Sequence, residues 1–407
     1  MTWEKEIDIH EVKEIRSRNT TYLGVGALKK IDDIVAAMKD MGHTKYVVVT
    51  GKGAYKRVGA WAEVEKAFAK HGASYVLYDQ VTPNPTVDQI DEATKLGLDH
   101  GATAVLSIGG GSPIDAAKSV AILLHYPKET GRTLYEYKFT PTSAAPLVCI
   151  NLTHGTGTEV DRFAVASILE QDFKPAIAYD CIYPLYAIDD PALMTELSEH
   201  QTRYVSIDAV NHVTEAATTK MFSSPYSVMM AAETVRLIDE HLPRVLKDPK
   251  DLEARYYLLY ASAIAGIAFD NGMLHLTHGL EHPLSAVKPD LTHGQGLAIL
   301  LPSVVEEIWP VKCKTLRHVL APMFDADFPA DPARGHDAAL QVERWLQKMG
   351  AVEKLTDMGF SADDVPHLVD LTRETPSLGL LLDLAPVDAT PELVERIYRN
   401  SLTPLNK

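Results

Sequence analysis

The first half of the chain alternates strongly apolar runs with helix-forming stretches, and this alternation constrains the fold more than any other feature. Strands buried on both faces belong to parallel sheets, whose crossover connections are usually helices. The pattern therefore predicts a doubly wound, mostly parallel, Rossmann-like α/β domain over residues 1–194. The runs with strand character are YVVVT (46–50), SYVLYD (74–79), AVLSI (104–108), PLVCIN (146–151) and YAIDD (186–190).

The composition changes after Asp190-Pro191, where strand-like runs become scarce and long helix formers take over. Stretches such as TRYVSIDAVNHVTEAATTKM and DLEARYYLLYASAIAGIAF have helical spacing, with Pro and Gly at their ends. We therefore expect an all-α second domain over residues 195–407. The boundary lacks a Gly/Ser linker, so we expect the two domains to pack closely across a cleft.

Charge, hydropathy and cysteine content argue against a nucleic-acid-binding, membrane-spanning or secreted protein. A formal charge of −16 and the absence of a basic stripe argue against nucleic acid. No apolar run approaches the length of a membrane span, and the charged N-terminus does not read as a secretory signal. The 3 cysteines form no CxxC pair, which favours free thiols in a cytoplasmic protein.

A glycine cluster follows the AVLSI run and leads into a helix. Gly109, Gly110 and Gly111 would let a pyrophosphate approach the backbone at a helix N-terminus. Ser112 is suited to be the N-cap, with Pro113 in the first turn and Asp115 completing an S-x-x-D pattern. The same residues could merely cap a helix. The loop NLTHGTGTEV (151–160) is a candidate second wall of the nucleotide site, with capping again the alternative.

One carboxylate and several imidazoles in the second half form a candidate metal site. Asp208 and His212 are four residues apart, so on a helix both point the same way. His278 and His282 repeat this spacing, and His293 follows nearby. An aspartate with three histidines suits a divalent first-row metal. The alternative is that these histidines are ordinary core or surface residues.

These motifs resemble the iron-containing (group III) alcohol dehydrogenases along nearly the whole chain. The resemblance implies a dinucleotide-binding α/β domain and a helical metal domain. The chain would then be a metal-dependent NAD(P)-linked alcohol dehydrogenase or aldehyde reductase acting on a small primary alcohol or aldehyde, and a homodimer. The matching stretches are TPNPT (82–86), GGGSPIDAAK (109–118), GTGTEV (155–160), AIDDP (187–191), DAVNH (208–212) and THGLEHPLSAVKPDLTHGQGLAILLP (277–302).

The resemblance also implies roles for single residues. Fe²⁺ is the expected metal, with Mn²⁺ or Zn²⁺ possible, and its ligands would be Asp208, His212, His278 and His293. His282, just before Pro283 where a helix tends to end, would relay a proton or orient substrate without binding the metal. His275 is expected on the helix surface or behind a ligand. The cofactor contacts implied are Asn84, Gly109, Gly110, Gly111, Ser112, Asp115, Lys118, Thr153 and Thr156.

The residues after YVVVT bear on the choice of cofactor. An acidic residue there accepts hydrogen bonds from the 2′-hydroxyl of NAD. In NAD-using proteins of the family that the chain resembles, an Asp commonly occupies the position of Gly51. Lys52 or Lys56 could instead meet a 2′-phosphate. We expect NADP(H) to be preferred over NAD(H), and the alternative is a turn with solvated lysines.

Two positions depart from the usual pattern of the family. His154 stands where a small residue is common, and Asp161 stands where Thr is common. The substrate therefore does not carry over from the resemblance. A polyol dehydrogenase of the glycerol type, a lyase-type relative, and a non-catalytic assembly-forming relative are the alternatives.

Overall fold

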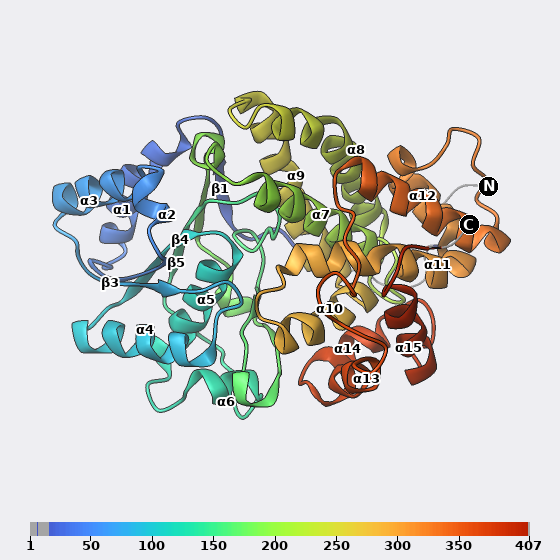
Figure 1. The fold of residues 1–407 in the computed structure, drawn as a ribbon. Coiled ribbons are helices and arrows are strands. Elements are labelled where there is room, and N and C mark those ends of the chain that lie inside the picture. The colour runs from blue at the N-terminus through green and yellow to red at the C-terminus, as the bar shows by residue number, and fades with distance from the viewer. Residues whose placement is uncertain (1–5, 7–15, 406–407) are drawn as a thin grey trace. The chain divides into compact units, whose positions relative to one another are not determined.

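The computed structural model describes residue 6 and residues 16–405 (Figure 1). The chain forms two compact units. The α/β unit contains residues 17–197 and 248–263, and the helical unit contains residues 198–247 and the chain from 264 onward, with Glu6 and Arg16.

The α/β unit is built on a six-stranded sheet in the order β1-β8-β5-β4-β2-β3. Every pair of neighbouring strands is parallel, which confirms the predicted fold class. β1, an edge strand, was not predicted from the sequence because TTYL is short and half polar. The strands are β1 Thr20–Leu23, β2 Lys45–Gly51, β3 Ser74–Val81, β4 Ala104–Gly109, β5 Leu147–Asn151 and β8 Tyr186–Asp189.

Both faces of this sheet are buried, as the continuous apolar runs predicted. Along β2, Val47 and Val49 enter one hydrophobic core, whereas Tyr46 and Val48 enter the other. This alternation follows from the two-residue period of a strand. The helices of the α/β unit are α1 Ile31–Asp40, α2 Ala54–Arg57, α3 Ala60–His71, α4 Val87–His100, α5 Gly111–His125 and α6 Gly131–Tyr135.

A small antiparallel hairpin, β6 Phe163–Val165 with β7 Ala176–Ala178, follows the second candidate loop. Its three-residue strands are too short to show a two-residue period in the sequence. Single-turn 3₁₀ helices complete this unit; they are η2 Ala27–Lys30, η3 Leu169–Gln171, η4 Asp180–Ile182 and η5 Pro191–Met194.

The helical unit contains the long helices expected from the second half of the chain. α9 contributes residues 252–263 to the α/β unit and residues 264–272 to the helical unit. The helices are α7 Glu199–Ala216, α8 Pro225–Lys247, α9 Leu252–Gly272, α10 Leu276–Val287, α11 His293–Val319, α12 Gly335–Lys348, α13 Val365–Glu374, α14 Leu378–Asp383 and α15 Pro391–Asn400, with 3₁₀ turns η6 Ala321–Met323 and η7 Pro332–Arg334. None of the helices described has the length and apolar character needed to cross a membrane.

α10 corrects one expectation. The helix does not end before Pro283 but continues to Val287. Proline lacks the N–H that would bond to the carbonyl one turn earlier, which costs stability. The residues from Leu276 to Ala286 are all buried, so the packing of this helix offsets the missing hydrogen bond.

Candidate metal centre and nucleotide loops

Asp208 and His212 lie one turn apart on α7, and both are buried. His212 Nε2 is 3.5 Å from Asp208 Oδ1. The ring of His212 is stacked between Phe269 on α9 and His278 on α10, with ring centroids 4.5 Å and 4.6 Å away. The imidazole is therefore fixed by aromatic packing on both faces.

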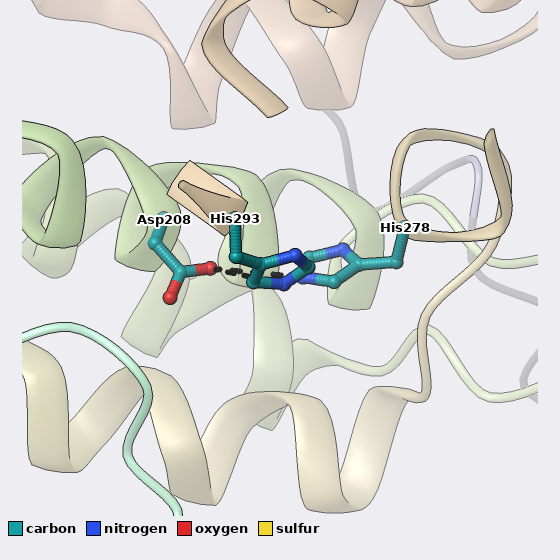
Figure 2. Close-up of side chains that lie close together, drawn as sticks. All are labelled: Asp208, His278 and His293. Atoms are coloured by element: carbon teal, nitrogen blue, oxygen red, sulfur yellow. Dashed lines mark ion pairs between the residues drawn. The ribbon is translucent and has the colours of Figure 1, made fainter. Parts of the chain in front are cut away.

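His278 and His293 approach the same carboxylate oxygen from two other helices (Figure 2). His278 Nε2 lies 3.7 Å and His293 Nε2 lies 4.0 Å from Asp208 Oδ1. Four ligand atoms placed tetrahedrally at about 2.1 Å from one ion would be about 3.4 Å apart. Asp208, His278 and His293 therefore lie together with nearly the spacing that one metal ion requires, and His212 Nε2 reaches the same carboxylate oxygen.

Buried atoms of this cluster, including a carboxylate oxygen and an imidazole nitrogen, lack an ordinary partner. Asp208 Oδ1 and His278 Nε2 are buried, and neither has a hydrogen-bond partner among the residues that the structure describes. Leaving a buried polar atom unsatisfied costs free energy. An aspartate oxygen and imidazole nitrogens are suitable donors for a divalent ion, so the residues present fit such a group.

The electrostatics of the site keep the carboxylate ionised. Burial raises the pKa of Asp208, but the surrounding imidazoles outweigh burial and lower this pKa to about 2. Burial lowers the pKa of His278, but Glu215 and Asp208 outweigh this effect and raise it to about 9. Burial lowers the pKa of His212 to about 4 despite Asp208. A metal would displace the proton of His278 when it binds.

A second carboxylate, Glu215, holds His278 from behind. Glu215 is fully buried on α7, and its Oε2 accepts a hydrogen bond from His278 Nδ1. Its Oε1 also accepts the backbone N–H groups of His275, Thr277 and His278 at the start of α10. Burial raises the pKa of Glu215, but contacts with His278 outweigh burial and lower it to about 2.

A third carboxylate, Glu281 on α10, contacts His293 in the same way. Glu281 is fully buried, and its Oε2 pairs with Nδ1 of His293. Neither Glu215 nor Glu281 was predicted from the sequence. The sequence shows how far each glutamate lies from the predicted ligands along the chain. It does not show which ring nitrogen of the histidine each glutamate contacts.

His282 and His275 have different surroundings. His282 is buried on α10 beside the cluster, with its ring centroid 5.7 Å from that of His293. His275 is not on the helix surface as one alternative had it, because its side chain is fully buried. Its Nε2 lies 2.9 Å from Thr218 Oγ1, and its backbone N–H donates to Glu215, which contacts His278. The structure therefore places His275 behind His278, one of the predicted ligands.

The two candidate nucleotide loops pack directly on one another within the α/β unit. A Cβ added at Gly110 would lie 2.6 Å from Thr153 Cγ2, and one added at Gly111 would lie 2.7 Å from Thr156 Cγ2. These glycines are therefore required by the threonines of the second loop. The hydroxyl groups of Thr153 and Thr156 are buried without a hydrogen-bond partner in the described part of the chain, so they are available to a ligand.

The start of α5 differs from the predicted capping arrangement. The helix begins at Gly111, and its N-cap is Gly110 without a side-chain cap, so Ser112 is not the N-cap. Asp115 completes no box with Ser112. Its oxygens accept instead from Thr158 Oγ1 at 2.7 Å and from the backbone N–H of Val165 at 3.0 Å. No side chain caps the start of α5. Gly109, Gly110 and Gly111 are instead fixed by close packing against Pro113, Thr153 and Thr156.

Lys118 occupies the interior beneath these loops. Its side chain is fully buried, and Nζ donates to Asp161 Oδ1 at 2.7 Å, Thr158 Oγ1 at 2.8 Å and the Phe163 carbonyl at 2.6 Å. All three protons of an ammonium group are thus used within the protein. The structure gives Lys118 the role of joining α5 to the loop that carries Asp161.

The remaining predicted cofactor residues lie at strand ends and in a loop. Gly51 ends β2, which pairs with β4 just before the glycine loop, and Lys52 is exposed. Lys56 Nζ lies 5.2 Å from the centre of the Tyr55 ring. Asn84, in the loop after β3, has a left-handed backbone with φ of 53°.

His154 makes a contact that the sequence did not suggest. Its Nε2 lies 2.9 Å from Nη1 of Arg255 on α9, and both side chains are buried. Burial, with a contribution from the Arg255 charge, lowers the pKa of His154 to about 3. The ring is therefore neutral and accepts a hydrogen bond from the guanidinium group.

Comparison with known proteins assigns both halves of the chain. Residues 19–191 match the family described as iron-containing alcohol dehydrogenase, and residues 202–402 match the C-terminal region of the same family. A long-chain primary alcohol dehydrogenase, AdhA, from Thermoanaerobacter ethanolicus is 57% identical over 98% of this chain and 100% of its own. Alcohol dehydrogenase 4 of Saccharomyces cerevisiae is 34% identical over 70% of this chain and 73% of its own.

Solved structures give the same result. An alcohol dehydrogenase from an archaeal halo-thermophile of a Red Sea brine pool matches with a TM-score of 0.88 at 25% identity, covering 97% of this chain and 100% of the other. The NADH-dependent butanol dehydrogenase A of Thermotoga maritima matches with a TM-score of 0.84 at 27% identity, covering 97% and 99%. Fold and sequence together define an alcohol dehydrogenase. The chain belongs to the iron-containing alcohol dehydrogenase family, which implies iron and a nicotinamide cofactor.

Proposed function

We propose that this alcohol dehydrogenase interconverts a primary alcohol and its aldehyde with NADP(H), using one divalent metal ion. Fe²⁺ is the first candidate, and Mn²⁺ or Zn²⁺ suits the same ligands. The observation that carries the proposal is the convergence of three imidazole Nε2 atoms within 4.0 Å of Asp208 Oδ1. The 57% identical relative acts on long-chain primary alcohols, so we propose that class of substrate rather than a small alcohol.

The chain's own residues divide the work. Asp208, His212, His278 and His293 would hold the ion. Oxidation of an alcohol removes a proton from oxygen and a hydride from the adjacent carbon. When bound, the metal supplies the positive charge that lowers the pKa of the hydroxyl, and the nicotinamide supplies the hydride acceptor. His282 is buried beside His293 and lies outside the predicted ligand set. We assign it the relay of the proton that leaves the alcohol oxygen.

The second candidate loop, residues 151–160 and here called the threonine loop, would position the cofactor. The buried hydroxyls of Thr153 and Thr156 offer hydrogen-bonding groups beside the glycine backbone of the other loop. Lys118 and Asp115 would support this arrangement from below, because their polar atoms hold the threonine loop.

The preference for NADP(H) rests on the end of β2. Gly51 offers no carboxylate to repel a 2′-phosphate, and the exposed Lys52 follows it directly. Lys56 lies against Tyr55, so we assign the phosphate contact to Lys52. The butanol dehydrogenase relative is NADH-dependent. A preference for NADP(H) and a preference for NAD(H) are distinguished by the ratio of kcat/KM for the two cofactors.

The test is a panel of primary alcohols and aldehydes of increasing chain length, run on metal-reconstituted protein with NADP(H) and with NAD(H). We expect kcat/KM to rise with chain length and to favour NADP(H). No turnover of any alcohol with either cofactor would contradict the proposal. Light scattering after size exclusion tests the homodimer that we also propose.

A further inference from the structure

The three histidines of the cluster are held to different degrees. His212 and His278 have side chains only 6% and 3% exposed, and their rings stack on one another. The side chain of His293 is 26% exposed. His293 is also the first residue of α11 and follows the non-helical residues 288–292. Packing alone therefore restricts His293 less than the other two.

Glu281 supplies the restraint that packing does not. It reaches from α10 to Nδ1 of His293, and its side chain is fully buried. With Nδ1–H donating to this carboxylate, Nε2 carries the lone pair and faces Asp208 Oδ1. A carboxylate in this place fixes both the tautomer and the direction of a ligand imidazole.

α11 leaves room for this carboxylate. Gly296 lies one turn beyond His293, and a Cβ added there would be 2.8 Å from Glu281 Cγ and 3.1 Å from its Oε1. The side chain of Glu281 lies so close to the backbone at position 296 that only a glycine fits there without a shift. The absence of a side chain at 296 therefore serves the position of Glu281.

We propose that Glu281 is a positioning residue that sets the metal affinity of this site by holding His293. The inference rests on the proposed function, since it concerns the same ion. If Glu281 has this role, the affinity of the site for its metal ion depends on a residue outside the predicted ligand set. A substitution at Gly296 should then change that affinity only by displacing Glu281.

A different role for Glu281 is measurable. Glu281, His282 and His293 each have a ligand atom within 4.8 Å of the others, so these three could gather around an ion of their own. The positioning role is favoured because His293 already presents Nε2 to Asp208 while its Nδ1 meets Glu281. A count of ions per chain separates the two roles.

The experiment uses the full chain stripped of metal and titrated with Co²⁺, whose visible absorption reports ligand geometry. The variants are Glu281→Gln, which keeps an acceptor oxygen, Glu281→Leu, which removes it, and Gly296→Ala, which displaces the carboxylate. Glu343→Gln is the control, because Glu343 is also a buried carboxylate of the helical unit and pairs with Lys354. Thermal unfolding of each metal-free variant is measured in parallel.

We expect Co²⁺ affinity to fall about 100-fold in Glu281→Leu and about tenfold in Glu281→Gln, within the range for groups behind a metal ligand. Gly296→Ala should weaken binding and alter the Co²⁺ spectrum, and its metal-free protein should unfold somewhat earlier than wild type, because the buried contact with Glu281 outweighs the helix preference of alanine. Glu343→Gln should unfold earlier but bind Co²⁺ normally.

Wild-type affinity in both Glu281 variants would overturn the inference. So would two ions per wild-type chain and one in Glu281→Leu, because Glu281 would then be a ligand. If Glu281→Leu does not fold, Glu281→Gln and Gly296→Ala decide the matter, and normal affinity in both overturns it. A wild-type chain that binds no Co²⁺, Fe²⁺ or Zn²⁺ would contradict the proposed function itself.

Discussion

Replacing Lys118 by Met should destabilise the α/β unit severely while affecting the cofactor only indirectly. The Lys118–Asp161 pair is completely buried, and the ammonium also donates to Thr158 and Phe163. Removing one partner of a buried pair leaves an uncompensated charge and costs about 3–5 kcal/mol. At roughly 2–4 °C per kcal/mol for a unit of this size, the melting temperature should fall by about 6–20 °C.

A second substitution tests the cause of this loss. Asp161→Asn removes the remaining charge but keeps an oxygen for the backbone N–H of Phe163, which donates to Asp161 Oδ1 at 2.7 Å. Replacing both members of a buried pair is often close to neutral. The variant carrying Lys118→Met with Asp161→Asn should therefore recover at least half of the lost stability.

Urea unfolding of the metal-free protein and cofactor titration by fluorescence are the two assays. The reasoning would be refuted if Lys118→Met lost less than about 1 kcal/mol of unfolding free energy while cofactor binding weakened tenfold or more. That pattern would mean that the ammonium faces the cofactor directly. Exposed Lys95, which pairs with Asp99 on the surface of α4, provides a control, because Lys95→Met should leave both measurements unchanged.

Four further outcomes follow from the site. His278→Ala should lose bound metal and turnover, measured by metal analysis and assay; full metal content with normal rate would refute its role. His282→Ala should keep its metal but lose rate with an altered pH profile; loss of metal as in His278→Ala would make it a ligand. Gly51→Asp should shift kcat/KM toward NAD(H), whereas Gly51→Ala, which also places a Cβ 3.1 Å from the Val81 carbonyl, should not; equal shifts would exclude a charge effect. Because the folded pKa of His154 is about 3, below its ordinary 6.5, stability should decline as pH falls from 6.5 toward 3, and His154→Gln should be less acid-sensitive in urea unfolding; unchanged sensitivity would contradict this.

The sequence predicted the parts of the fold whose signal is local. Buried strands such as β2 and β4 are continuous apolar runs, and the predicted ligands on α7, Asp208 and His212, show their helical spacing directly. The assignment of Ser112 as N-cap was wrong because packing against the threonine loop, which lies far along the chain, decides how α5 begins. Contacts between distant segments leave no periodic signal.

The same limit applies to the supporting residues of the site. Glu281 stands between two histidine-containing motifs, yet its role depends on the approach of α11 to α10. Lys118 was predicted to line the cofactor cleft, and nothing in the sequence indicated its buried ion pair with Asp161. Identity at a position predicts possible chemistry, whereas the partner that uses this chemistry is set by tertiary structure.

The interlocking of Gly110 with Thr153 and of Gly111 with Thr156 has an evolutionary consequence. Each pair shares a space too small for two side chains, so a methyl group can enter on one side only if the other side shrinks. Homologous sequences should therefore vary at these positions in concert, with Ala at 110 accompanied by Gly or Ala at 153. Laboratory evolution that enlarges Gly110 or Gly111 would have to shrink Thr153 or Thr156 as well, and the glycine substitution alone should impair folding.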